Sequence, residues 1–95
     1  MGKKVAVIVK DKARQYEGLR SSLGLLLEDH RVSMFVLEHE IELTEEYEDN
    51  MGFIDEMDGA RYSNVRENVE KHGFTNVTME SMAHMLKEND LIIPF

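Results

Sequence analysis

The sequence contains no cysteine, a single proline and no apolar run longer than five residues. Without cysteine the chain forms no disulfide, thiolate nucleophile, zinc–thiolate site or iron–sulfur site, and it carries no persulfide of its own. Apolar runs of four or five residues are too short to span a membrane. The opening Met-Gly-Lys-Lys, followed by Val5–Val9, does not have the pattern of a signal peptide. We therefore expect a single-domain cytoplasmic protein, residues 1–95, with no membrane contact.

Charge is distributed unevenly along the chain, whose formal net charge is −8. Residues 1–31 carry seven Lys/Arg against four Asp/Glu, whereas residues 38–58 carry ten Asp/Glu and no Lys or Arg. Because phosphate neutralisation supplies most nucleic-acid affinity, this balance argues against a nucleic-acid partner. A dense acidic block is typical of a solvated surface or of a docking patch for a basic partner. The candidate partner-binding residues are Glu42, Glu45, Glu46, Glu48 and Asp49.

Five short apolar segments predict five strands. The first two lack polar alternation, which is typical of strands buried on both faces. The expected strands cover residues 5–9, 32–37, 60–62, 77 and 91–93. Amphipathic segments between them predict four helices. Strands that alternate with helices in this way indicate an α/β fold, a three-layer α/β/α sandwich around a five-stranded parallel sheet.

The ends of the predicted helices carry recognisable capping residues. The first helix runs from about 14 to 29, and the second begins at Thr44 and ends at Gly59. The third lies between Asn64 and Gly73, and the fourth follows Thr78.

Two details of the helices follow from residue type. Gly52 should weaken the second helix or make it irregular. Met79, Met82 and Met85 recur at helical spacing in the fourth helix, so we expect all three to face a core or subunit interface.

Ligands of open parallel sheets bind outside the carboxyl ends of the strands. The loop after the first strand places Lys10, Lys12 and Arg14 before a helix N-terminus, a place suited to an anion. It contains no glycine and is therefore not a familiar phosphate-binding loop, and a solvated basic loop is the simpler interpretation. A ligand site here would also draw on the end of the third strand, at Tyr62, Ser63 and Asn64.

No catalytic, metal or cofactor site is predicted. Ser63 lacks the Gly-x-Ser-x-Gly elbow and an identifiable base, so capping by Ser63 or Asn64 explains these residues better than a hydrolase does. Glu38-His39-Glu40 could contribute to a metal site, but no second histidine follows at ligand spacing. The sequence leaves enzymatic activity open and favours a protein without it.

The segments Lys4–Val9, Tyr16–Leu25 and Val32–Leu37 resemble the opening of DsrE/DsrF-like proteins, and Gly73–Thr78 with Asn89–Phe95 resembles their close. The resemblance implies a parallel sheet of strand order 4-3-2-1-5 and assembly into homo-oligomers or hetero-oligomers with a DsrE-type protein. It also implies an association with sulfur relay, in which some members carry a persulfide on a cysteine after the third strand. Here that neighbourhood reads Arg61-Tyr62-Ser63-Asn64, so the carrier role does not transfer.

Two functions follow as hypotheses. The first is a DsrE-like, non-catalytic subunit that self-associates and docks a partner in sulfur relay or redox metabolism through its acidic segment. The alternative is a protein that binds a small anion or nucleotide with the loop after the first strand.

Overall fold

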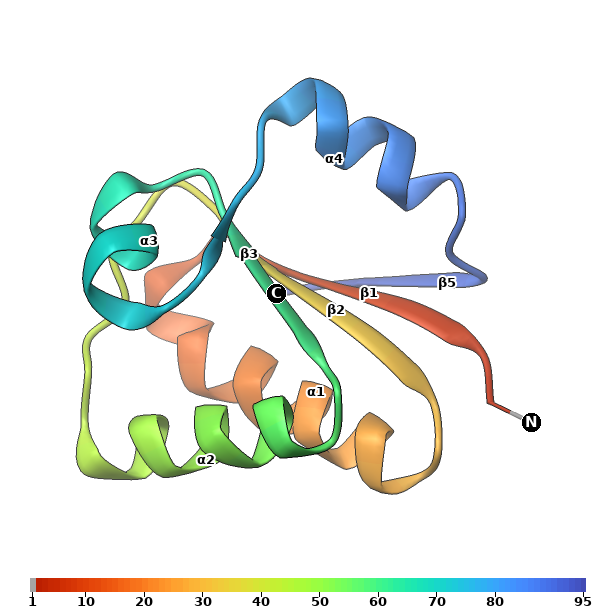
Figure 1. Ribbon diagram of the computed structural model, residues 1–95, viewed down its shortest axis with the longest axis horizontal. Coiled ribbons are helices and arrows are strands. Elements are labelled where there is room, and N and C mark those ends of the chain that lie inside the picture. The colour runs from red at the N-terminus through yellow and green to blue at the C-terminus, as the bar shows by residue number, and fades with distance from the viewer. Residues whose placement is uncertain (1) are drawn as a thin grey trace.

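In the computed structural model, which describes residues 2–95, five parallel strands form one sheet of order β4-β3-β2-β1-β5 (Figure 1). The strands are β1 (Lys4–Val9), β2 (Arg31–Val36), β3 (Ala60–Ser63), β4 (Thr75–Asn76) and β5 (Leu91–Pro94). The helices are the 3-10 turn η1 (Lys12–Arg14), α1 (Gln15–Leu27), α2 (Glu45–Glu56), α3 (Arg66–His72) and α4 (Met79–Leu86). The predicted α/β class and parallel sheet are confirmed, and so is the strand order that the resemblance implied.

The strand order explains the unequal layers. From β1 to β4 each new strand is added on the same side, so right-handed crossovers bring α1, α2 and α3 to one face. The step from β4 back to β5 reverses direction and brings α4 to the other face (Figure 1). One eight-residue helix therefore covers the second face alone. No helix within residues 2–95 has the length and apolar character needed to cross a membrane.

Strand β1 forms the centre of both cores. Val5, Val7 and Val9 pack under α1 and α2, whereas Ala6 and Ile8 pack under α4. The two sets alternate because successive side chains of a strand point to opposite faces. The absence of polar alternation in the sequence therefore reflects burial on both faces, as predicted.

The fourth strand directly precedes its predicted position. It comprises Thr75 and Asn76, which pair with Tyr62 and Ser63, and the expected position Val77 follows it. The Val77 amide still donates a hydrogen bond to the Ser63 carbonyl, and its side chain is buried in the core under α4. The apolar residue thus marks the turn into α4 instead of the strand itself.

One predicted helix cap is wrong. Helix α3 is preceded by Val65 and has no side-chain cap, because Asn64 instead accepts a hydrogen bond from the Glu38 amide. Gly52 does not interrupt α2, which runs unbroken from Glu45 to Glu56, so its predicted weakening of the helix concerns stability and not shape. Met79 is 55% exposed and does not pack in the core, whereas Met82 is buried, so for Met79 the predicted subunit interface stays a prediction.

Arg61 joins three elements across the edge of the first face. Its guanidinium donates two 2.8 Å hydrogen bonds to the Asp55 carboxylate and one of 2.9 Å to the His72 carbonyl. It also lies 4.9 Å from the centre of the Phe74 ring. The arginine side chain is only 9% exposed. The Asp55 carboxylate therefore holds α2 against β3 and α3. Unlike the other acidic side chains of α2, it is paired with a cation.

Two glycines in helices offer a matched test of the packing. A Cβ added at Gly52 would meet open space, so Gly52→Ala should stabilise α2 by about 0.5–1 kcal/mol. A Cβ added at Gly18 would clash with Val9 Cγ2, so Gly18→Ala should destabilise the protein by about 1–3 kcal/mol. Urea denaturation of both variants measures these free energies. Equal effects of the two substitutions would contradict the described packing of α1 on β1.

Candidate functional site

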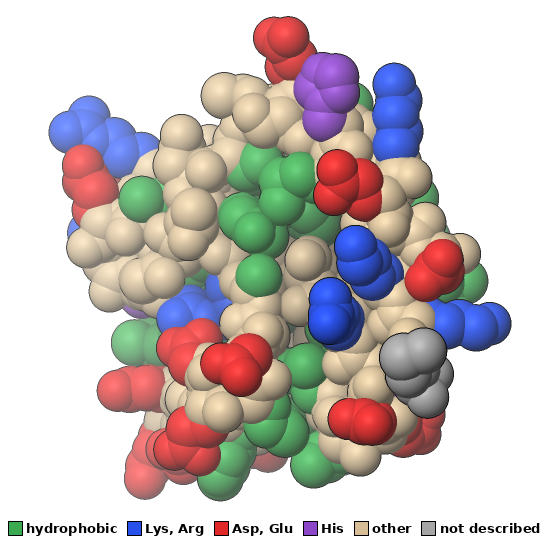
Figure 2. Space-filling view, turned by 45° about the vertical axis from the view of Figure 1, so that its right-hand side comes forward, with side chains coloured by type: hydrophobic (Ala, Val, Ile, Leu, Met, Phe, Trp, Pro, Cys, Tyr) green, Lys and Arg blue, Asp and Glu red, His purple; other side chains and the backbone are tan. Residues whose placement is uncertain are grey.

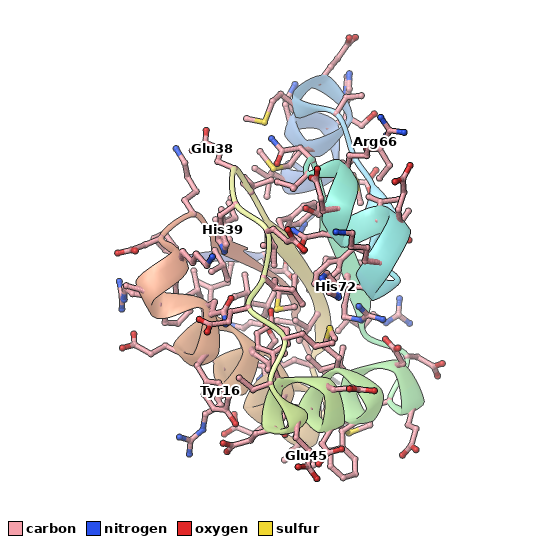
Figure 3. All side chains as sticks on the ribbon, turned by 90° about the vertical axis from the view of Figure 1, so that its left-hand side faces the viewer. Tyr16, Glu38, His39, Glu45, Arg66 and His72 are labelled. Atoms are coloured by element: carbon pink, nitrogen blue, oxygen red, sulfur yellow. The ribbon has the colours of Figure 1, made fainter. Side chains whose placement is uncertain are left out.

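The carboxyl ends of the strands carry the loops in which the sequence predicts a ligand site (Figure 3). Glu38 is the second residue of the long segment between β2 and α2, and its backbone adopts the left-handed conformation with φ 69°. Lys10 Nζ lies 3.9 Å from Glu38 Oε2, and Asn64 Oδ1 accepts a 3.0 Å hydrogen bond from the Glu38 amide. Of the predicted ligand residues, Lys10 and Asn64 therefore lie close together, because both contact Glu38.

The other two cations of the basic loop, Lys12 and Arg14, do not contact Glu38. Arg14 donates a 2.9 Å hydrogen bond to the Glu17 carboxylate, and its guanidinium lies over the Phe95 ring. Lys12 is exposed, and no carboxylate within residues 2–95 lies within 4.0 Å of its ammonium. Carboxylates beside Lys10 and Arg14 would compete with a bound anion at both positions.

Backbone donors of the same loop are also occupied. The amides of Lys10 and Asp11 both donate to the Phe95 carbonyl, at 3.0 and 3.4 Å, and the Asp11 carboxylate accepts from the Ala13 amide. An anion site needs backbone N–H groups that point at the ligand. The geometry therefore gives the loop after β1 less support as an anion site than the three cations alone suggested.

Ser63 lies beneath this edge and is fully buried. Its hydroxyl donates a 2.7 Å hydrogen bond to the Val36 carbonyl and accepts from the Val65 amide and from Asn68 Nδ2, each at 3.0 Å. With its hydrogen-bonding capacity used within the protein and no exposed surface, Ser63 cannot reach a substrate as a nucleophile. The structure assigns it a role in holding β2, β3 and α3 together.

Asn68 completes this buried polar cluster, and the sequence analysis missed it. Its amide nitrogen donates to the His39 carbonyl at 2.9 Å, and its oxygen accepts from the Ile41 amide at 2.9 Å. The side chain is fully buried. Its position three residues after Val65 and one before Val69, on the inward side of α3, is the signal in the sequence that could have identified it.

Tyr62 points to the opposite face from Ser63, because neighbours in a strand alternate. It stacks on Phe35 with ring centroids 5.1 Å apart and lines a hollow at the amino end of the sheet together with Arg31 and Met85. Tyr62, Ser63 and Asn64 therefore do not form one site. The first lies under α4, the second is buried, and only the third reaches the carboxyl edge.

The five predicted partner-binding residues are all exposed. We call them the acidic surface: Glu42, Glu45, Glu46, Glu48 and Asp49. They lie just before and along the first half of α2, near the labelled Glu45 in Figure 3. No Lys, Arg or His within residues 2–95 pairs with any of them within 4.0 Å. Leu43 and Phe53, 45% and 52% exposed, add apolar area beside these carboxylates.

The acidic surface has a rigid base. Thr44 caps α2 by accepting a hydrogen bond from the Tyr47 amide, and acidic side chains in the first turn favour the positive end of the helix dipole. Tyr47 is fully buried in the core, and burial raises the pKa of its hydroxyl. The nearby Glu46 carboxylate raises the pKa of Tyr16, whose hydroxyl accepts a hydrogen bond from Asn50. The carboxylates are thus presented from a fixed helix.

The histidines near this edge do not combine into a ligand set. His39 Nδ1 lies 3.0 Å from the Leu37 carbonyl, and His72 Nε2 lies 3.3 Å from Glu40 Oε2. Figure 3 shows His39 and His72 on separate segments. In the part of the chain that the structure describes, no three His, Asp or Glu side chains are placed to hold a metal ion together.

Replacing Asn68 by leucine tests the buried cluster. Asn68→Leu removes the partners of the His39 carbonyl and the Ile41 amide and one donor to Ser63, so we expect a loss of about 2–4 kcal/mol in unfolding free energy. The Ile41 amide should exchange with solvent markedly faster. Asn76→Leu, at an exposed position of β4, serves as the control and should change stability by about 0.5 kcal/mol or less. A similar effect of both substitutions would contradict the role of Asn68.

Comparison of the chain with protein-family models, curated proteins and solved structures found no match. These comparisons therefore assign the chain to no family.

Proposed function

We propose that this chain is a non-catalytic, DsrE-like subunit of the cytoplasm whose acidic surface docks a basic region of a partner protein. The observation that carries the proposal is the acidic surface itself: five exposed carboxylates on and before one capped helix, with no cation paired to them among residues 2–95. Unpaired negative charge at this density makes the local electrostatic potential strongly negative. Such a potential steers a positively charged partner toward the surface.

The exposed apolar residues make the surface suited to a protein and not only to counterions. Charged side chains at the rim of an interface chiefly affect the association rate, whereas buried apolar groups supply most of the affinity. Phe53 follows Asp49 by four residues on α2 and therefore lies on the same side of the helix. A partner that covers Phe53 would bring its cations next to the carboxylates. A basic surface with an apolar centre is the matching chemistry.

The association with sulfur relay or redox metabolism comes from the resemblance. Its support is the strand order β4-β3-β2-β1-β5, which the resemblance implied before the sheet was known. The chain has no cysteine, so the reactive sulfur would be carried by the partner. A hetero-oligomer with a cysteine-bearing DsrE-type protein would supply such a partner, whereas a homo-oligomer would not, because every copy of this chain lacks cysteine. Because one fold hosts many functions, the partner has to be identified by experiment.

Native mass spectrometry of the tagged chain, recovered from cells of its own host, tests this proposal. We expect a stoichiometric complex with a cysteine-bearing protein. The triple variant Glu45→Gln, Glu48→Gln, Asp49→Asn removes three charges from the acidic surface and should weaken the complex at least tenfold, or about 1.4 kcal/mol. Glu46 is left unchanged because it contacts Tyr16. Phe53→Ala should weaken the same complex.

The matched control removes three carboxylate charges elsewhere: Glu28→Gln, Glu67→Gln and Glu80→Gln. Glu67 and Glu80 lie in the first turns of α3 and α4, so the control also includes losses at helix starts. It should leave the complex intact. Recovery of a homo-oligomer or monomer alone, or equal weakening by both triple variants, would count against docking through the acidic surface.

A further inference from the structure

A hollow of about 550 Å³ lies at the amino ends of the strands, away from the carboxyl edge described above. Lys4, Arg31 and Ala60, the first residues of β1, β2 and β3, all line it. Figure 2 turns this side of the molecule toward the viewer and shows basic side chains adjoining near the middle of the face. The volume of the hollow falls in the range of small-molecule sites, about 300–1,000 Å³. We call it the amino-end hollow.

The hollow adjoins the core under α4, whose last turn contributes Met85 to its lining. The core under α4 contains Ala6, Ile8 and Phe35, which lie further along their strands than the residues at the strand starts. Lys4, Arg31 and Ser33 lie on that same face, since they alternate in phase with Ala6 and Phe35. The sheet surface that α4 does not reach is therefore the floor of the hollow.

The floor carries two cations side by side. Lys4 and Arg31 are direct partners in the register of β1 and β2, where neighbouring strands lie about 4.8 Å apart. No carboxylate within residues 2–95 lies within 4.0 Å of either charged group. Like charges on adjacent positions of a sheet repel each other. An anion bound between them would remove this repulsion, and the Ser33 hydroxyl lies next along the same face.

One wall of the hollow is apolar. Tyr62 reaches it from β3 with its ring held against Phe35, and Met85 faces it from α4. A flat or branched apolar group could pack against these side chains while a charged group reached the floor. Ligands gain most of their affinity from apolar burial and their orientation from a few polar groups.

Acidic side chains on the rim limit the charge of the ligand. Asp58, from the turn before β3, and Glu88, after α4, also line the hollow. Their repulsion disfavours polyanions such as nucleotides, whose further charges would approach the rim.

We propose that the amino-end hollow binds a small organic monoanion, with its carboxylate between Lys4 and Arg31 and an apolar or aromatic body against Tyr62 and Met85. This site is separate from the acidic surface and from the basic loop after β1, and it does not depend on the proposed docking function.

Amide chemical shifts in a titration with phenylacetate test the site. Phenylacetate should shift residues 31–33, 60–62 and 85–89 saturably, with a Kd of about 1 mM for a fragment of this size. Acetate lacks the ring and benzyl alcohol lacks the charge, so both should bind at least tenfold more weakly. Lys4→Gln with Arg31→Gln should weaken phenylacetate binding at least tenfold. Tyr62→Val should reduce it to the level of acetate.

The control variant carries Lys12→Gln and Arg20→Gln, which remove two exposed cations of the first third of the chain and should leave the Kd unchanged. The amide spectrum of each variant also shows whether it is folded. Shifts centred on residues 10–14, equal binding of benzyl alcohol or acetate, or equal weakening by both double variants would overturn the proposal.

Discussion

The buried hydrogen bonds of Ser63 and Asn68 determine the shape of the carboxyl edge. Both side chains are fully buried, so each of their polar groups has to find a partner inside the protein. Ser63 connects the end of β3 to the Val36 carbonyl at the end of β2, and Asn68 connects α3 to the backbone of His39 and Ile41. These bonds set the path of the segment that leads into α2. The position of the acidic surface therefore depends on a polar cluster that contributes no charge to it.

Much of the fold follows from apolar patterning, whereas the grouping of candidate site residues does not. Val5–Val9 indicated a doubly buried strand, and Tyr47, Met51 and Ile54, which recur at helical spacing in α2, are all buried. Tyr62, Ser63 and Asn64 are neighbours in the sequence but do not form one site. Strand alternation and the turn that follows place their side chains in three different surroundings. Helical periodicity places Asn68 on the inward side of α3, but it does not identify its partners, the backbone groups of His39 and Ile41 in a distant loop.

The reversal of strand order at β1 accounts for the other unpredicted feature. Three crossovers bring helices to one face, and only the return to β5 brings a helix to the other. The starts of β1 and β2 consequently remain uncovered on the α4 side, where Lys4 and Arg31 meet. Ligands of open α/β sheets usually bind outside the carboxyl ends of the strands, where the strand order reverses. Here the two cations of the floor and the apolar wall of Tyr62 and Met85 lie together at the amino ends.

Helix α2 separates the two regions that we propose bind other molecules. The acidic surface lies at its beginning, and Met57 and Asp58 at its end line the amino-end hollow. Its 12 residues extend about 18 Å, roughly twice the screening length at physiological ionic strength. The cations of the hollow and the carboxylates of the acidic surface therefore do not neutralise each other. Binding at one region does not change the electrostatic potential at the other. The net charge of −8 does not predict the local electrostatic potential of either region, because nearby unpaired side chains determine it. Any coupling between a bound anion and a docked partner would have to be mechanical, through a displacement of α2 against the Arg61–Asp55 pair that holds it to β3.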